Sequence, residues 1–419
     1  MKILMMTNTF PPFVGGVSRS VTSFSRELRT MGHRVMIVAP EFERVPKSEK
    51  DVIRIPAIQH FNGSDFAVAL PIPGLLSAQL HHFKPDLVHS HHPHLLGGTA
   101  LRAAGRFDCP LVFTYHTMYE HYVHYVPAHA KRFRKFVIEL VSGYCNLCDR
   151  VVAPSGSVAE LLRERDVETA IDVVPTGVYT EQFGRGDGGR FRQAHAIPKN
   201  AFVAGYVGRL APEKNLAFLA KAIRAFAARC ERGHFLVVGS GVSEGALRKT
   251  FADEGLVERL HLAGSLDGQA LADAYHAMDV FVFASYTETQ GMVLTEAMAA
   301  GKPVVALDAP GVREVARDTY NGRLLKTQSA ADFAAAIADL EKDPASRKHA
   351  MSQAARQTAE EFSMDRSAAR LVEVYERALR RQPDRATDTS LWHHAVERIR
   401  AEWELMRNVA EAAADTFTQ

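Results

Sequence analysis

Short apolar runs alternate with longer amphipathic stretches along the chain. Residues 3–6, 111–115 and 280–284 are runs of four or five mostly apolar residues, too short for helices and typical of strands buried in a sheet. Residues 17–30 and 365–379 instead repeat apolar positions at the helical spacing. Alternation of strand and helix predicts an α/β protein built on parallel sheets.

The length of the chain predicts two domains, because 419 residues exceed one ordinary domain. The glycine-rich segment 184–189 is the best candidate for a linker by its composition. We therefore expect one domain at residues 1–183 and a second at residues 184–364.

Composition argues against several classes of protein. Hydrophobic residues make up 47% and charged residues 23%, as in ordinary globular proteins, and the net charge of +2 gives no signal for nucleic acid. Cys145 and Cys148 lack a second cysteine pair, which favours buried thiols in a reducing cytoplasm over a zinc site. The amino terminus indicates a first strand and not a signal peptide, and no apolar run reaches the roughly 18 residues of a membrane helix.

Residues 279–302 hold the strongest candidate site. A strand at 280–284 is followed by a polar loop, and Gly291 opens a helix that Gly301 ends. Glu288 precedes this helix and Glu296 lies inside it, with seven residues between them. Ligands of parallel sheets bind where strands end, and free N–H groups at a helix start attract phosphate. The helix start at Gly291, Met292 and Val293 is therefore expected to bind an anion.

This stretch resembles the Glu-x7-Glu signature of the retaining glycosyltransferases of family GT4, which have two facing Rossmann-like domains, the GT-B fold. The resemblance implies that Glu288 contacts the donor sugar near the reacting carbon and that Glu296 binds the ribose. The Thr289-Gln290-Gly291 loop is more similar to that of members that glycosylate diacylglycerol than to that of members acting on soluble sugars. The resemblance also implies that the helix at residues 365–379 crosses back to pack on the first domain, so we expect residues 365–419 to complete that domain.

Two cations follow the first strand of the second domain. That strand ends at Gly208, and Arg209 and Lys214 flank the loop before the next helix, a placement that suits a diphosphate. An isolated pair of this kind would more simply be two surface charges. The Gly-Arg-Leu-x-x-x-Lys pattern is similar to that of the family, which favours the diphosphate. The resemblance also implies donor-binding roles for Gly239 and for Leu262, where the family holds the nucleobase.

The first domain offers two further candidates. Gly15 and Gly16 lie in the loop after the first strand, where a plain turn and a close approach to a ligand are equally compatible with the position. His116 follows the strand at 111–115. The family resemblance implies that the glycines contact the donor diphosphate and acceptor and that His116 hydrogen-bonds the donor sugar. The histidines between 81 and 94 share no ligand spacing with acidic residues or cysteines, so we expect no metal.

Residues 118–141 combine aromatic and basic side chains. Tyr119, Phe133 and Phe136 accompany a basic cluster of Lys131, Arg132, Arg134 and Lys135. A surface helix with a solvated basic face would look the same. Such a helix can also lie in an anionic membrane surface, where each basic residue contributes about 1 kcal/mol. Beside a sugar site, in a chain resembling lipid glycosyltransferases, we favour membrane binding.

The tail, residues 381–419, repeats apolar positions at helical spacing. A helix covering the first domain is the simplest interpretation, and a membrane or dimer contact is the alternative. The family resemblance covers roughly residues 1–380 and leaves this tail unexplained.

Together these features predict a retaining, metal-independent enzyme in the cytoplasm, peripheral on the inner face of the cell membrane. It would move a hexose from a UDP-sugar to a membrane lipid such as 1,2-diacylglycerol, without a cofactor. Glucose is the hexose that we favour. Phosphatidylinositol or a soluble acceptor is the first alternative. A nucleotide-sugar epimerase or a nucleotide-binding protein is the alternative from another class. A dinucleotide oxidoreductase would need Gly-x-Gly-x-x-Gly after strand one, where only Gly15-Gly16 is present.

Overall fold

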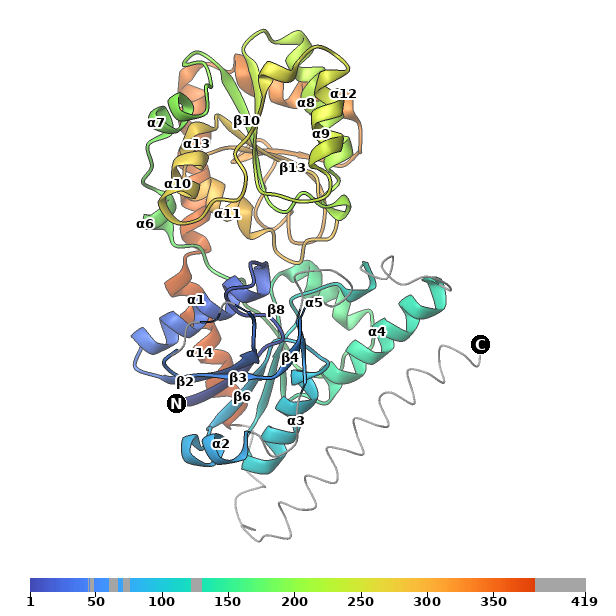
Figure 1. The fold of residues 1–419 in the computed structure, drawn as a ribbon, viewed down its shortest axis with the longest axis vertical. Coiled ribbons are helices and arrows are strands. Elements are labelled where there is room, and N and C mark those ends of the chain that lie inside the picture. The colour runs from blue at the N-terminus through green and yellow to red at the C-terminus, as the bar shows by residue number, and fades with distance from the viewer. Residues whose placement is uncertain (44, 46–48, 60–66, 71–75, 122–129, 381–419) are drawn as a thin grey trace. The chain divides into compact units, whose positions relative to one another are not determined.

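The computed structural model describes residues 1–43, 45, 49–59, 67–70, 76–121 and 130–380. These residues form two compact units (Figure 1). Unit 1 contains Met1–Thr176 and the described residues from Ser367 onward, and unit 2 contains Gly177–Arg366. The chain thus passes between the units at 176/177 and 366/367, where the sequence suggested 183/184 and 364/365.

Unit 1 is organised on a parallel sheet with the strand order β3-β2-β1-β6-β7-β8-β9. The strands are β1 (Lys2–Met6), β2 (Arg34–Pro40), β3 (Val52–Ile55), β6 (Leu87–Ser90), β7 (Leu111–Thr114), β8 (Arg150–Ala153) and β9 (Ile171–Val173). A short antiparallel pair, β4 (Ala57–Ile58) with β5 (Val68–Ala69), lies apart from this sheet. Strands β1, β6 and β7 lie in the middle and are almost entirely buried, which explains their continuous apolar character.

Helices cover both faces of the unit 1 sheet. They are α1 (Gly16–Thr30), α2 (Ser77–Phe83), α3 (Leu96–Phe107), α4 (Ala130–Asn146), α5 (Gly156–Arg163) and α14 (Met364–Arg380), with a 3₁₀ turn η2 (Tyr119–His121). Side chains of α2, α3, α4 and α5 share one apolar core with the strands. Helices α1 and α14 lie on the opposite face (Figure 1).

Unit 2 repeats the plan with the strand order β12-β11-β10-β13-β14-β15, again parallel. Its strands are β10 (Phe202–Val207), β11 (Gly233–Val238), β12 (Leu260–Leu262), β13 (Val280–Phe283), β14 (Val304–Leu307) and β15 (Gly322–Leu325). Its helices are α6 (Thr180–Phe183), α7 (Gly188–Ala194), α8 (Leu216–Arg229), α9 (Glu244–Ala252), α10 (Gly268–Ala277), α11 (Met292–Ala299), α12 (Ala330–Lys342) and α13 (Ala345–Glu361), with 3₁₀ turns η4 (Pro212–Lys214) and η5 (Val257–Arg259). Helices α8, α9 and α12 cover one face and α10, α11 and α13 the other (Figure 1).

The order of strands reverses once in each sheet. In unit 1 the reversal lies between β1 and β6, and in unit 2 between β10 and β13. At such a point the chain leaves two neighbouring strands toward helices on opposite faces, which separates the loops at their carboxyl ends and leaves room for a ligand. The two units therefore each place a candidate site at the carboxyl edge of the sheet.

The prediction that the last helix completes the first domain is confirmed for α14. The Tyr375 hydroxyl hydrogen-bonds His89 Nδ1 of β6 at 2.7 Å, and Arg377 pairs with Asp172 of β9 at 2.9 Å. Leu371, Val374, Tyr375 and Ala378 are buried along the same side of the helix. The tail, residues 381–419, lies outside the described residues.

We expected the glycine-rich segment 184–189 to be a linker between the units. This prediction is wrong, because the segment lies inside unit 2. It packs within unit 2 against α10, where a Cβ on Gly186 or Gly188 would lie within 2.5 Å of His276 atoms. Asp187 caps α7 by accepting from Arg190 N, and its own N–H donates to Asp273. The glycines therefore allow a close approach between two chain segments, which composition alone does not distinguish from flexibility.

The buried His89 makes stability depend on pH. Its two ring nitrogens bond Tyr375 and Thr114 at 2.7 Å each, and burial followed by nearby His116 lowers its pKa to about 3. An unfolded histidine has a pKa near about 6.5. Above that pH neither state binds the proton, so the contribution to stability is fully present. It is lost as pH falls from 6.5 toward 3, because only the unfolded chain takes up the proton.

We expect the free energy of unfolding of His89→Gln to fall less steeply than that of the wild type as the pH is lowered. Near pH 5 the slope should be smaller by up to about 1.4 kcal/mol per pH unit, which corresponds to one proton. Urea unfolding between about pH 4.5 and pH 7 measures this slope. The exposed His349, changed to Gln, serves as the matched control. Equal slopes in the two variants would show that His89 does take up its proton in the folded protein.

Candidate functional site

The loop after β10 presents the two cations of unit 2. The Tyr206 hydroxyl donates to Arg209 O at 3.1 Å, and Gly208 has a φ of 151°. A Cβ on Gly208 would lie 2.7 Å from that hydroxyl, so this turn needs glycine. The turn η4 then places Lys214 just before α8, and Asn215 Nδ2 donates to Ala284 O at the end of β13. The two loops at the strand reversal are thereby joined.

Lys214 and Glu288 meet across these loops. The lysine Nζ donates to Glu288 Oε1 at 2.5 Å, and the side chains are 15% and 19% exposed. The attraction between two charges is stronger when they are partly shielded from water, and at this exposure the pair remains accessible to a ligand. The structure therefore brings together two of the residues that the sequence singled out separately.

Arg209 is held by a residue that the sequence analysis missed. Its Nη2 donates to Glu213 Oε1 at 3.1 Å, and the arginine side chain is 59% exposed while that of Glu213 is 3% exposed. Glu213 Oε2 is buried without a hydrogen-bond partner in the described structure. The signal in the sequence is an acid placed directly before Lys214, a position that a solvated surface loop would equally allow.

The start of α11 faces the same loops. Gly291 has a φ of 71° and precedes the helix, whose first turn contains no acidic residue. A Cβ on Gly311 would lie 2.6 Å from Gln290 N, so the turn at Gly311 packs directly beneath the loop and supports it. Met292 and Val293 at the helix start are half-buried. Their N–H groups have no intrahelical acceptor, as at any helix start, and can bind an anion.

Glu296 is buried within α11 and has a second partner that the sequence did not reveal. The Tyr275 hydroxyl donates to Glu296 Oε2 at 2.7 Å, from α10. The glutamate is 3% exposed. This bond fixes one carboxylate oxygen and limits the directions from which a further hydroxyl can approach. No spacing rule connects Tyr275 to Glu296, because the two lie on different helices.

Glycines pack the ends of β10 and β11 together. Gly239 has a φ of 137°, and a Cβ there would lie 1.9 Å from Gly208 O. The Gly239 N–H donates to Gly264 O at 2.7 Å, in the turn that follows β12. Leu262, the last residue of β12, is half-buried beside this turn. These contacts place Gly208, Gly239 and Leu262 along one edge of the unit 2 sheet.

The loop after β1 in unit 1 leaves open space at one glycine. Gly15 is the N-cap of α1, and a Cβ there would lie 2.9 Å from the Phe13 ring. A Cβ on Gly16 would meet no atom within 4 Å. The backbone of Gly16 is therefore the part of this loop that a ligand can approach.

His116 follows β7 at the same edge of the unit 1 sheet and contacts another histidine. His91 Nδ1 and His116 Nε2 are 2.9 Å apart, and the rings stack with centroids 5.2 Å apart. Burial lowers the pKa of His116 to about 3, so the ring is neutral at pH 7. A neutral ring suits a hydrogen bond to a hydroxyl better than it suits charge neutralisation. The sequence analysis placed His116 after a strand but did not predict its contact with His91.

The other histidines of this edge bind the protein itself. His92 Nδ1 accepts from Asn8 N at 3.0 Å, and burial lowers the pKa of His91 and of His92. In the described residues no group of three histidines, cysteines or acids has the arrangement of a metal site. These side chains instead tie the loop after β1 to the loop after β6.

The aromatic and basic segment is described only in part. Tyr119 is half-buried in η2, and neighbouring Glu120 pairs with Arg165 at 2.5 Å. In α4 Arg134 is exposed, while Lys135 and Phe136 are half-buried. Residues 122–129 and the side chains of Lys131, Arg132 and Phe133 lie outside the described structure. Among the described helices, none combines the length and the apolar character needed to cross a bilayer.

Comparisons with known proteins agree with this architecture. The model of Glycosyltransferase Family 4 matches residues 14–182, and that of Glycosyl transferases group 1 matches residues 188–358. The alpha-monoglucosyldiacylglycerol synthase of Streptococcus pneumoniae is 28% identical over 367 residues, covering 84% of this chain and 81% of that protein. The GDP-mannose-dependent alpha-mannosyltransferase of Mycobacterium tuberculosis is 30% identical over 333 residues, covering 77% and 83%.

The fold also matches solved structures. The crystal structure of Anabaena HepE in complex with UDP and glucose superposes with a TM-score of 0.71 at 20% identity, covering 90% of this chain and 99% of that one. Two parallel-sheet, Rossmann-like units are the GT-B architecture that the sequence predicted. The chain belongs to the glycosyltransferases of family GT4.

Proposed function

We propose that the protein is a retaining glycosyltransferase that moves a hexose from a UDP-sugar to a membrane lipid such as 1,2-diacylglycerol. The observation that carries this proposal is the Lys214–Glu288 pair beside the start of α11. It combines a cation for a diphosphate with a carboxylate for sugar hydroxyls. A diphosphate and a sugar are the two parts of the donor.

The demanding step is cleavage of the bond between the anomeric carbon and the diphosphate oxygen. The electron pair of that bond leaves with the diphosphate, where Lys214, Arg209 and the N–H groups at the start of α11 would stabilise the negative charge. The acceptor oxygen then bonds the anomeric carbon on the same face. Its proton passes to an oxygen of the departing phosphate, so no protein base is required.

Other residues would orient the reactants. Glu288 would accept hydrogen bonds from sugar hydroxyls, and Glu296, whose carboxylate is oriented by the Tyr275 hydroxyl, would accept from the ribose. His116, neutral at pH 7, would bond a sugar hydroxyl without competing for the phosphate charge. The protein's own cations would supply the positive charge that a metal ion supplies elsewhere.

Glucose, UDP and diacylglycerol are the specific part of the proposal. Support comes from the Thr289-Gln290-Gly291 loop and from a relative that is a glucosyldiacylglycerol synthase. A mannosyltransferase that uses GDP-mannose is about as similar. A matrix of labelled UDP- and GDP-sugars against diacylglycerol, phosphatidylinositol and soluble acceptors, read by chromatography, tests the assignment. Transfer from GDP-mannose alone, or to soluble acceptors alone, would replace it.

The cations can be tested one at a time. We expect Lys214→Ala and Arg209→Ala each to lower kcat by a factor of hundreds, or about 3 kcal/mol. Each variant lacks one positive charge that would stabilise the departing diphosphate. Initial rates with saturating donor measure this. Arg248→Ala is a matched control for Arg209, since Arg248 also pairs with a glutamate four residues away and is similarly exposed.

Metal removal gives a separate test. EDTA should leave the rate unchanged; a loss that magnesium restores would contradict the metal-independent proposal.

The two glutamates should separate binding from transfer. Glu288→Gln should slow sugar transfer more than it weakens UDP binding, because its proposed partner is the sugar. Glu296→Gln should weaken UDP binding itself, because its proposed partner is the ribose. Calorimetry with UDP and initial rates measure the two effects, with Glu254→Gln as an exposed ion-paired control. Equal losses of UDP affinity in both variants would show that the roles are wrongly divided.

The lipid acceptor predicts electrostatic membrane binding through α4. Changing Lys131, Arg132, Arg134 and Lys135 together to Ser should weaken sedimentation with anionic vesicles. Wild-type binding should fall with salt, since charges are screened over about 10 Å at 0.1 M. The charge-matched control changes Lys221, Arg248, Lys249 and Arg370, all exposed on other helices, to Ser. If the α4 variant binds anionic vesicles as well as the control does, α4 is not the membrane contact.

A further inference from the structure

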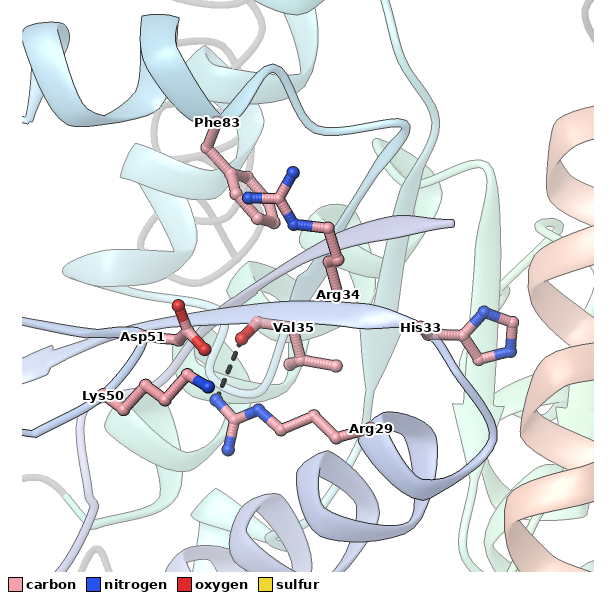
Figure 2. Close-up of a pocket in the computed structure, with 7 residues that line it drawn as sticks. All are labelled: Arg29, His33, Arg34, Val35, Lys50, Asp51 and Phe83. Carbon is pink, nitrogen blue, oxygen red and sulfur yellow. Dashed lines mark hydrogen bonds between the residues drawn. The ribbon is translucent and has the colours of Figure 1, made fainter.

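Unit 1 has a pocket at the edge of its sheet opposite to Gly16 and His116 (Figure 2). Those two residues follow the carboxyl ends of β1 and β7, whereas the pocket lies at the amino ends of β2 and β3. Its volume is about 420 Å³. Its lining residues come from the end of α1, the start of β2, the turn before β3 and the end of α2.

Positive charge dominates the lining. Arg29, Arg34 and Lys50 contribute three cations and Asp51 one carboxylate, which leaves a net charge of +2. Figure 2 shows the side chain of Lys50 extending toward the Arg29 guanidinium, with the Asp51 carboxylate beside them. Like charges brought together repel, and an anion bound between them would relieve that repulsion.

The arginines are held in place by groups that do not neutralise them. Arg29 Nη2 donates to Val35 O at 2.9 Å, and its Nε is buried without a hydrogen-bond partner in the described structure. The guanidinium of Arg34 lies 5.7 Å from the centroid of the Phe83 ring. Among the described residues neither arginine, nor Lys50, forms an ion pair. Arg54, Arg150 and Arg165 in the same unit each pair with a carboxylate.

His33 completes the lining with a neutral group. Its Nδ1 lies 3.3 Å from the amino terminus, and its pKa is lowered by burial first and by that charged amine second. A ring that is neutral at pH 7 can donate or accept one hydrogen bond at the pocket wall. The fixed backbone bond of Arg29 and the ring contact of Arg34 mean that little side-chain freedom remains to be lost on binding.

We propose that this pocket binds a phosphate-bearing ligand. Guanidinium groups match the geometry of phosphate oxygens with paired N–H donors, and Lys50 adds a mobile point charge. The pocket falls within the range of about 300–1,000 Å³ typical of small-molecule sites, so it has room for a phosphate and an attached group of modest size. Phe83 and Val35 provide an apolar wall for that group. The proposal does not depend on the donor site of unit 2.

The test is stabilisation of the full-length protein by inorganic phosphate at constant ionic strength, with saturating UDP present to occupy any donor site. The midpoint of thermal unfolding should rise saturably with phosphate. Changing Arg29, Arg34 and Lys50 together to Gln should weaken the apparent affinity by at least about tenfold, because three charged donors are lost. Changing Lys221, Lys249 and Arg370 to Gln removes the same charge from exposed sites elsewhere and should leave the affinity unchanged.

A second variant keeps the result decisive. If the triple variant does not fold, the double variant of Arg34 and Lys50 retains the Arg29 bond to Val35 and should still lose most of the phosphate effect. No saturable rise in the wild type, or equal rises in the pocket and control variants, would overturn the proposal.

Vesicles of phosphatidylglycerol compared with phosphatidylcholine distinguish the two sources of such a phosphate. A loss of phosphatidylglycerol binding in the pocket variant but not in its control assigns the site to a lipid headgroup. Equal vesicle binding, together with the phosphate effect, assigns it to a soluble phosphate ester.

Discussion

Lys214 and Glu288 lie 74 residues apart in the chain, and their ion pair exists because β10 and β13 are neighbours in the sheet. The chain leaves β10 toward α8 on one face and β13 toward α11 on the other (Figure 1). The intervening loops therefore separate, and their polar side chains meet at the edge instead of being covered. A cation, a carboxylate and a helix start converge there as a consequence of strand order, and the donor side of the proposed reaction depends on this convergence.

The edge of the unit 1 sheet is built on the opposite electrostatic principle. His89 and His116 are kept neutral by burial, and each bonds another neutral group. His89 uses both ring nitrogens within the protein, whereas His116 is the ring proposed to orient a substrate hydroxyl. Burial of these rings lowers the free energy of unfolding in acid. As the pH falls, the unfolded chain takes up protons that the buried rings cannot take up.

Sequence patterns predicted the two parallel sheets and the strand–loop–helix arrangement at residues 279–302, because each depends on local periodicity or on a motif at a strand end. The return of α14 to the first domain was implied by the family resemblance and not by any pattern within this chain. Sequence patterns could not predict contacts between residues on separate elements. Tyr275 with Glu296 and His91 with His116 depend on how helices and strands pack. Glu213 lies beside Lys214, which the sequence singled out, but only the ion pair in the structure shows that Glu213 holds Arg209. The segment 184–189 was mistaken for a linker because glycine permits both flexibility and close packing.

Whether a cation is paired with a carboxylate affects which anionic ligand it can bind. The charge of Lys214 is balanced by Glu288, so a bare diphosphate that drew the lysine away would leave a partly shielded carboxylate without its cation, at a cost. Under the proposed function, a sugar attached to the diphosphate would offset that cost, because its hydroxyls would donate to the carboxylate while the phosphate bound the lysine. In the proposed reaction the pair would therefore favour a whole sugar nucleotide over its diphosphate product, and it would re-form once the sugar had been transferred. Arg29 and Arg34 have no such balance, so a phosphate alone suffices for their pocket.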